Sequence, residues 1–244
     1  MPEIIKNIFV TVFEQPIFNL LVFFYNVIPG KDIGLAIIAI TIILKIVLYP
    51  FSLQAIKSQK ALQDLQPKLK ALQEELKADK EKLARATMEL YAKEKVSPFS
   101  SCLPLLIQFP FLIALYQAMR FGLASQKLEI LYPFVSNPGT IDPLFLGFLN
   151  LAAPSIPLAV IAGAAQFWQT KMLQTTRPPV RAPGSKDEDT MARMNKQMTY
   201  MMPVMTVVIG ASLPGGLALY WLMTNLLTVA QQMYFFKKNG TKAA

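Results

Sequence analysis

The chain has 244 residues, of which 53% are hydrophobic and only 16% charged, and its net charge is +9. Its mean hydropathy is +0.38, and its apolar residues are gathered into runs of spanning length, which excludes an ordinary soluble domain and indicates a polytopic membrane protein. A single cysteine, Cys102, excludes an intrachain disulfide, and the lack of histidine removes the commonest metal ligand and general base. We therefore expect no cofactor and no metal.

The N-terminal segment 1–32 contains an apolar stretch, from Ile8 to Ile28, that is interrupted by polar residues such as Glu14 and Asn19. These interruptions, together with many phenylalanines, are more typical of a helix lying in the outer interface of the bilayer than of one that crosses. Charge counting leaves both arrangements open, and a crossing would only move the N-terminus to the inner side. No cleavage site follows the N-terminus, so no removed signal peptide is expected.

Five further runs predict transmembrane helices. They cover residues 33–53, 98–119, 155–173, 198–213 and 214–236. The fourth run has 16 residues, about 24 Å as a helix against a hydrocarbon core near 30 Å, so it must thin the bilayer or be sheltered by its neighbours.

The segments between these runs set the orientation. They are a basic segment over 54–97, an outer loop over 120–154, a second basic loop over 174–197 and a tail over 237–244. Together with Lys171, the two basic segments and the tail hold 19 of the 24 Lys and Arg residues. The positive-inside rule places this side in the cytoplasm, with the N-terminus outside and the C-terminus inside.

The basic segment 54–97 carries the pattern of a helical hairpin. Leucines recur at 3-4-3-4 spacing over residues 62–76, and a weaker series follows a polar turn where Asp79 is placed to cap a second helix. This spacing predicts an antiparallel hairpin standing in the cytosol. Its mixed charges are either a solvated surface or a docking arm for a ribosome, a targeting factor or a nascent chain.

Lys45 is a charged residue inside the first predicted span, near its end. A cation in hydrocarbon costs at least about 2.5–3.5 kcal/mol, so it rarely persists without a role. The alternative is a lysine that snorkels to the polar end of the span near Ser52, roughly 10 Å away, and has no task. Position alone leaves both interpretations open.

Short motifs form an ordered series along nearly the whole chain. They are Leu48–Pro50, Leu65–Leu69, Met88–Tyr91, Glu94–Pro98, Cys102–Pro110, Ala114–Tyr116, Pro214–Trp221, Asn225–Leu226 and Gln231–Gln232. In this order, around a charged hairpin, they resemble the YidC/Oxa superfamily of membrane protein insertases. The likeness runs from about Phe13 to Phe236, and the small size resembles the compact five-span members.

The resemblance implies an all-α membrane protein in which five transmembrane helices surround a hydrophilic groove, with an N-terminal interfacial helix and a cytoplasmic antiparallel helical hairpin. It implies a non-enzymatic insertase and chaperone of the bacterial inner membrane that works without nucleotide hydrolysis. In that family a cation in the first span attracts the acidic N-terminal tails of substrates. Lys45 matches its position, although the usual residue is arginine, whose bidentate fork lysine lacks.

The resemblance also implies the partners. These are nascent membrane proteins and membrane lipids, with the ribosome, the signal recognition particle or its receptor, and the Sec translocon as further candidates. Spans three and five of the family meet the substrate. No sequence-specific binding of nucleic acid is expected.

A groove in hydrocarbon needs hydrogen-bonding walls, so polar residues inside the spans are its candidate lining. The alternative role of each is to hold two helices together. Four of those in the last span follow 4-4-3 spacing and share one helix face. The candidates are Thr41, Lys45, Gln108, Gln166, Gln169, Tyr220, Thr224, Asn225, Thr228 and Gln231.

Two other classes of protein fit the sequence less well. A small-solute or ion transporter is the main alternative, but proton-coupled transporters usually carry acids within spans, and all 15 acids lie outside the five predicted runs. The runs also show no paired repeat. An intramembrane enzyme is disfavoured because no catalytic set is recognisable without histidine or carboxylates at membrane depth.

Overall fold

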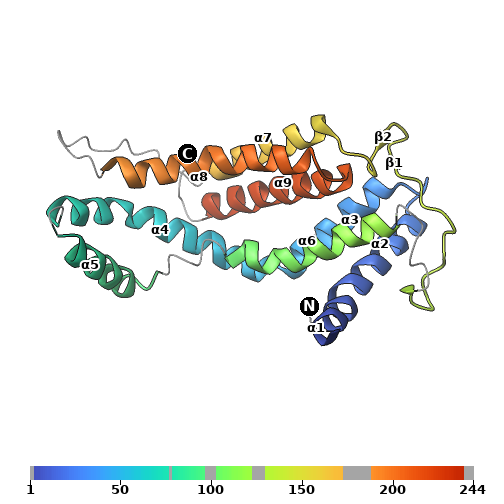
Figure 1. Cartoon of the computed structure of the whole chain (residues 1–244), viewed down its shortest axis with the longest axis horizontal. Helices are drawn as coiled ribbons and strands as arrows, with labels where there is room; N and C mark the ends of the chain where they lie inside the picture. The colour runs from blue at the N-terminus through green and yellow to red at the C-terminus, as the bar shows by residue number, and fades with distance from the viewer. Residues whose placement is uncertain (1–2, 77–78, 97–102, 123–129, 173–187, 239–244) are drawn as a thin grey trace.

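The computed structural model describes residues 3–76, 79–96, 103–122, 130–172 and 188–238. These residues form an elongated, mainly helical body, with a pair of helices projecting at one end and an irregular loop at the other (Figure 1). The mainly helical fold expected from the sequence is therefore found.

At the N-terminus, α1 (Glu3–Phe9) and α2 (Gln15–Val27) are joined by a π-helical turn, η1 (Val10–Glu14). By length and apolar composition, Asn7–Val27 is the one unbroken helix in the described ranges that could cross a membrane. Glu14 lies inside it and is buried, with 3% of its surface exposed. An acid therefore lies within this candidate span, although none lies within the five later runs.

The first predicted span, 33–53, is divided by a bend. α3 (Ile33–Val47) is capped by Asp32, whose Oδ1 accepts a 3.0 Å hydrogen bond from the backbone N–H of Leu35. α4 (Tyr49–Glu75) follows after one residue, with a proline in its first turn, and the two axes differ by 69°. The helix therefore breaks at Leu48, inside the predicted span, because proline favours the start of a helix over its interior. The boundary of the span at residue 53 stays a prediction.

α4 and α5 (Lys80–Lys93) form the projecting pair of helices (Figure 1). Asp79 caps α5 as the sequence indicated, because its Oδ1 accepts a 3.0 Å hydrogen bond from the backbone N–H of Lys82. Of the leucine series, Leu65 and Leu69 are buried, each with 4% exposure, while the others are half buried.

The remaining described helices are α6 (Leu103–Gly122), α7 (Ile156–Met172), α8 (Glu188–Gly210) and α9 (Gly215–Lys238). α7 packs extensively against both α8 and α9. α8 begins at Glu188, inside the loop predicted over 174–197, and residues 174–187 lie outside the described ranges.

Fewer of the helices in the described ranges are long and apolar enough to cross a membrane than the runs in the sequence suggested. α3 and α4 together qualify as one broken span, whereas Leu106–Phe121 and Thr199–Gly210 are shorter apolar helices. α7 has only 17 residues, and α9 carries the polar series of the last predicted span. The number of spans therefore stays a prediction.

Residues 130–154 fold against the end of the bundle opposite the α4–α5 pair (Figure 1). Within them β1 (Leu144–Phe145) and β2 (Leu149–Asn150) pair antiparallel, so the described part of the chain departs from the all-α prediction by one short hairpin. The backbone N–H of Gly215 donates to the carbonyl of Ala153 at 2.9 Å, which fixes the loop to the start of α9.

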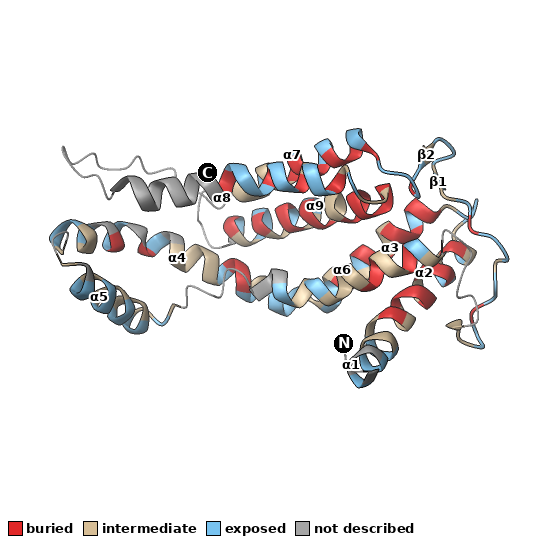
Figure 2. Ribbon diagram, viewed as in Figure 1, coloured by how far each residue is buried: buried red, intermediate tan, exposed pale blue. Residues whose placement is uncertain are grey.

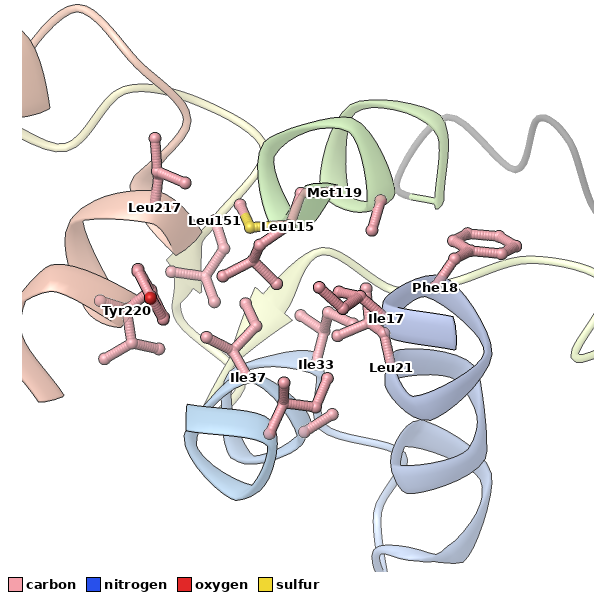
Figure 3. Packing of buried hydrophobic residues seen from close by; sticks show 14 of the residues in the cluster. Ile17, Phe18, Leu21, Ile33, Ile37, Leu115, Met119, Leu151, Leu217 and Tyr220 are labelled. Atoms are coloured by element: carbon pink, nitrogen blue, oxygen red, sulfur yellow. The ribbon is translucent and has the colours of Figure 1, made fainter. Parts of the chain in front are cut away.

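The main hydrophobic core lies at this loop end of the bundle (Figures 2 and 3). Apolar side chains from α2, α3, α6, α9 and the loop meet there. They include Ile17, Phe18, Leu21, Ile33, Ile37, Leu115, Met119, Leu151 and Leu217. A Cβ at Gly216 would lie 2.4 Å from Cε of Met119, so glycine allows α9 to approach α6 closely and closes the core.

Candidate functional site

A partly open hollow with a cavity volume of about 50 Å³, here called the polar hollow, lies between α3, the start of α4, α6 and α9. Polar and apolar side chains share its wall. They are Thr41, Leu44, Lys45, Leu48, Phe51, Ser52, Ile107, Gln108, Tyr220 and Thr224. Five of the ten sequence candidates therefore line one cavity, and Lys45 is its charged member.

The amine of Lys45 is held inside the bundle. Its Nζ donates a 2.7 Å hydrogen bond to Oγ1 of Thr228 on α9. That hydroxyl donates its own hydrogen to the carbonyl of Thr224 at 2.6 Å, so only its lone pairs are available to Lys45. An ammonium group has three N–H donors, and the bond to Thr228 uses one of them. The ion pairs among the described residues do not include Lys45, so its charge is not neutralised by an acid there.

Two further side-chain hydrogen bonds join α9 to its neighbours around the polar hollow. Oγ of Ser52 on α4 donates to Oε1 of Gln231 at 2.8 Å. Nε2 of Gln108 on α6 donates to the hydroxyl of Tyr220 at 2.9 Å. The polar face predicted on the last span therefore meets α3 and α4 on one side and α6 on the other.

Thr41 has a more local role. Its hydroxyl donates to the carbonyl of Ile37 at 2.7 Å, and its side chain is buried. Directly beyond it, Ile37 and Ile40 are fully buried in the main core. The main apolar core therefore begins next to Thr41, on the side of the polar hollow nearer the loop end.

Three sequence candidates are not brought to the polar hollow. Oγ1 of Thr206 on α8 donates to Oε1 of Gln166 on α7. Nδ2 of Asn225 donates to the carbonyl of Ala162 on α7 at 3.3 Å. Gln169, also on α7, is half buried and does not line the cavity. Gln166 and Asn225 thus take the alternative role, that of joining helices.

Sequence reasoning missed Ser52 as a partner of α9. It lies seven residues after Lys45, a spacing that would place both on one face of a straight helix. The apolar wall residues, such as Phe51 and Ile107, carried no signal, because a side chain facing a cavity and one facing lipid look alike in sequence.

The comparisons with known proteins agree with one another. The family model described as 60Kd inner membrane protein matches residues 23–242. A membrane protein insertase YidC of Pelobacter propionicus is 37% identical over 93% of this chain but only 39% of its own length. The YidC of Fusobacterium nucleatum is 35% identical over 86% of this chain and 88% of its own length.

Among solved structures, the fold matches a crystal structure described as an active YidC insertase with its first transmembrane domain resolved. The TM-score is 0.62 and the identity 26%, and the match covers 93% of this chain and 46% of that one. The chain therefore belongs to the YidC/Oxa family of inner membrane proteins, and it is a protein of the bacterial inner membrane. It spans about two fifths of the length of the first of these relatives.

Proposed function

We propose that this chain is a membrane protein insertase and chaperone that moves short acidic tails of nascent membrane proteins into the bilayer. The observation that carries the proposal is the polar hollow, in which an ammonium group without an acidic partner among the described residues faces a partly open cavity. The family and the names of its relatives support the same role.

The chemistry asked of the hollow is electrostatic, and no bond is broken. Moving a carboxylate into hydrocarbon is opposed by the loss of its hydration. Hydroxyl and amide groups of the hollow replace part of that hydration, and Lys45 offsets the negative charge. The core at the loop end keeps the cavity from forming a continuous pore. Because the loop end is closed by this core, we expect the substrate tail to enter from the side of the α4–α5 pair.

The driving force comes from the substrate. Its apolar helix gains about 0.8 kcal/mol for each CH₂ group transferred from water to lipid, so no nucleotide is required. The short apolar part of α8, Thr199–Gly210, lowers the remaining barrier by thinning the bilayer around it.

Orientation and partners complete the proposal. The α4–α5 pair and the C-terminal end of α9 face the cytoplasm, as the distribution of Lys and Arg favours. There α4 and α5 can meet a ribosome, a signal recognition particle or its receptor, or the Sec translocon, while nascent membrane proteins enter the hollow.

The test is reconstitution of the purified chain in vesicles without nucleotide. Two single-span substrates would share one apolar helix and differ only in an acidic or a neutral N-terminal tail. We expect the chain to raise protease protection of both tails above the level in protein-free vesicles, and to raise that of the acidic tail more. Vesicles that take up small solutes or ions but insert neither substrate would favour a transporter.

A further inference from the structure

The loop 130–154 exposes large apolar side chains although it is an ordered part of the fold. Phe134, Leu146 and Phe148, here called the apolar tips, are 78%, 58% and 76% exposed. Asp142 is the only charged residue in the loop. A loop that projects into water normally carries charged and polar side chains, so this composition points to another environment.

The apolar tips are held in place from beneath. Oδ1 of Asn19 on α2 accepts a 2.6 Å hydrogen bond from the backbone N–H of Tyr132, and Nδ2 of Asn26 donates to the carbonyl of Ser136 at 2.6 Å. Val135, next to Phe134, has only 6% exposure and packs in the main core. Asn19 and Asn26, two polar residues within the first apolar stretch, thus fasten the loop, and its apolar tips face outward from a fixed support.

Three backbone amides of the β1–β2 tip donate hydrogen bonds within the protein. Oδ2 of Asp32 accepts from the N–H of Leu146 at 2.6 Å, and Oδ1 of Asp142 accepts from that of Leu144 at 2.9 Å. The N–H of Phe148 donates to the carbonyl of Phe145 at 3.2 Å. A segment whose amide groups are already bonded loses little when it leaves water for a lipid interface.

The loop also lies next to other exposed apolar surface at the same end of the bundle. Ile156, which opens α7 directly after the loop, is 65% exposed, and Val27, at the end of α2, is 61% exposed. These side chains open or end helices of a membrane protein, for which lipid is the expected surrounding. The apolar tips lie at the same end of the bundle.

We propose that the apolar tips are inserted into the boundary between headgroups and acyl chains of the leaflet opposite the α4–α5 pair. The occupant is lipid and not a protein partner, because a protein interface surrounds its apolar centre with a polar, charged rim, and this loop has one charge. Aromatic and aliphatic side chains on a supported backbone anchor peripheral elements at this depth. The loop is then a second membrane contact of the fold, separate from the polar hollow and independent of the proposed insertase activity.

The test places spin labels on single cysteines in the Cys102→Ser chain, reconstituted in vesicles. Phe134→Cys and Phe148→Cys report the apolar tips. Val208→Cys, on the exposed apolar face of α8, gives a lipid reference, and Glu74→Cys, on α4, gives an aqueous reference. Collision rates with oxygen, which concentrates in lipid, and with a water-soluble nickel chelate give the depth of each label.

We expect the oxygen-to-nickel ratio at 134 and 148 to be several-fold above that at 74 and below that at 208. A ratio equal to that at 74 would overturn the proposal, because the tips would then lie in water. Protection from both reagents that grows with the protein-to-lipid ratio would also overturn it, in favour of contact between two copies. Because the exposed side chains at 134 and 148 are replaced without loss of core packing, misfolding is not expected to obscure the result.

Discussion

The ammonium group of Lys45 donates a 2.7 Å hydrogen bond to the hydroxyl of Thr228, 183 residues further along the chain. A lysine that snorkelled would instead reach along its own helix toward the headgroups. The bond fixes the charge beside the polar hollow and joins α3 to α9. Thr228 is thus a positioning residue for Lys45, and it can be tested separately from the charge itself.

Thr228→Val keeps the shape of the side chain but removes the acceptor for Lys45. We expect insertion of an acidic-tailed substrate to fall about fivefold, equivalent to roughly 1 kcal/mol for a lost hydrogen bond, while a neutral-tailed substrate is little affected. Thr228→Ser keeps the hydroxyl and should retain most of the activity. Equal losses for both tails in Thr228→Val, or equal losses in the valine and serine variants, would contradict a role through Lys45.

Lys45→Ala should lower insertion of acidic-tailed substrates more strongly than Thr228→Val does, because it removes the charge and not only its orientation. Lys45→Arg should retain activity, since guanidinium keeps the charge and adds a bidentate donor pair for carboxylates. Proteoliposome insertion of matched acidic and neutral tails measures both. If Lys45→Ala inserts the two tails as well as the unmodified chain does, Lys45 has no part in the mechanism.

The polar face of α9 shows how much of the site the sequence could predict. Helical spacing predicted that Tyr220, Thr224, Thr228 and Gln231 share a face, and the structure places them along the contact with α3, α4 and α6. Spacing within one helix cannot say which neighbour that face meets. Gln166 therefore looked like a lining residue, although Thr206 of α8 binds it.

Two other outcomes depended on contacts between distant segments. The bend at Leu48 follows from a proline two residues later, but an apolar run that continues past it concealed the break. Asn19 lowered the apolar character of the first stretch and so favoured an interfacial helix. In the structure it fastens residues 130–132 of the loop, a role that requires knowing the tertiary fold.

The ion pair between Lys68 on α4 and Glu94, just after α5, predicts a pH dependence of the helical pair. The hydrogen bond from Lys68, together with its charge, lowers the pKa of the Glu94 carboxyl. Because the pKa is lowered in the folded state, the ion pair stabilises the packing of α4 and α5 at pH values above about 4.3, the ordinary pKa of glutamate. This contribution is lost as the pH falls through the folded-state pKa of Glu94. The distribution of distances between labels on α4 and α5 should therefore broaden on acidification. The effect is modest because the Lys68–Glu94 ion pair is exposed.

Glu94→Gln should broaden that distance at neutral pH and reduce its response to acid. The matched control is Glu81→Gln, because Glu81 pairs with Arg85 within α5 and does not join the helices. Asp79, whose pKa is lowered mainly by the backbone N–H of Lys82, stays intact in both variants. If the two variants show identical distances and identical pH responses, the Lys68–Glu94 pair does not hold the helices together.

Gly163 sets the separation of α7 and α8. A Cβ at this position would lie 2.5 Å from Cγ2 of Val207 and 3.1 Å from the carbonyl of Pro203. Gly163→Ala should therefore lower the free energy of unfolding by about 1–3 kcal/mol, as overpacking does. Adding Val207→Ala should recover part of the loss, whereas Ala164→Ser, on the exposed face of α7, should change little. Thermal unfolding in detergent or bicelles measures all three, and a Gly163→Ala chain as stable as the unmodified one would show that α8 moves freely.

Removal of the buried side-chain amide of Gln232 should stabilise the folded chain. Its side chain is fully buried on α9, and neither Oε1 nor Nε2 has a hydrogen-bond partner in the described part of the chain. Its neighbours one turn away, Val229 and Phe236, pack in an apolar cluster with Met172 of α7. An unbonded buried amide costs about 1–3 kcal/mol, so Gln232→Met, which keeps the length of the side chain, should raise the free energy of unfolding by a similar amount.

The adjacent position provides the control. Gln231 accepts a hydrogen bond from Ser52, so Gln231→Met removes a bond between α4 and α9 and should not stabilise the chain. Unfolding of both variants in bicelles, followed by far-ultraviolet circular dichroism, separates the two effects. A destabilised Gln232→Met chain would mean that the amide is bonded in the membrane, through water or to a residue outside the described ranges. The interface between α7 and α9 would then contain water or a further polar group next to Gln232, although the neighbouring side chains are apolar.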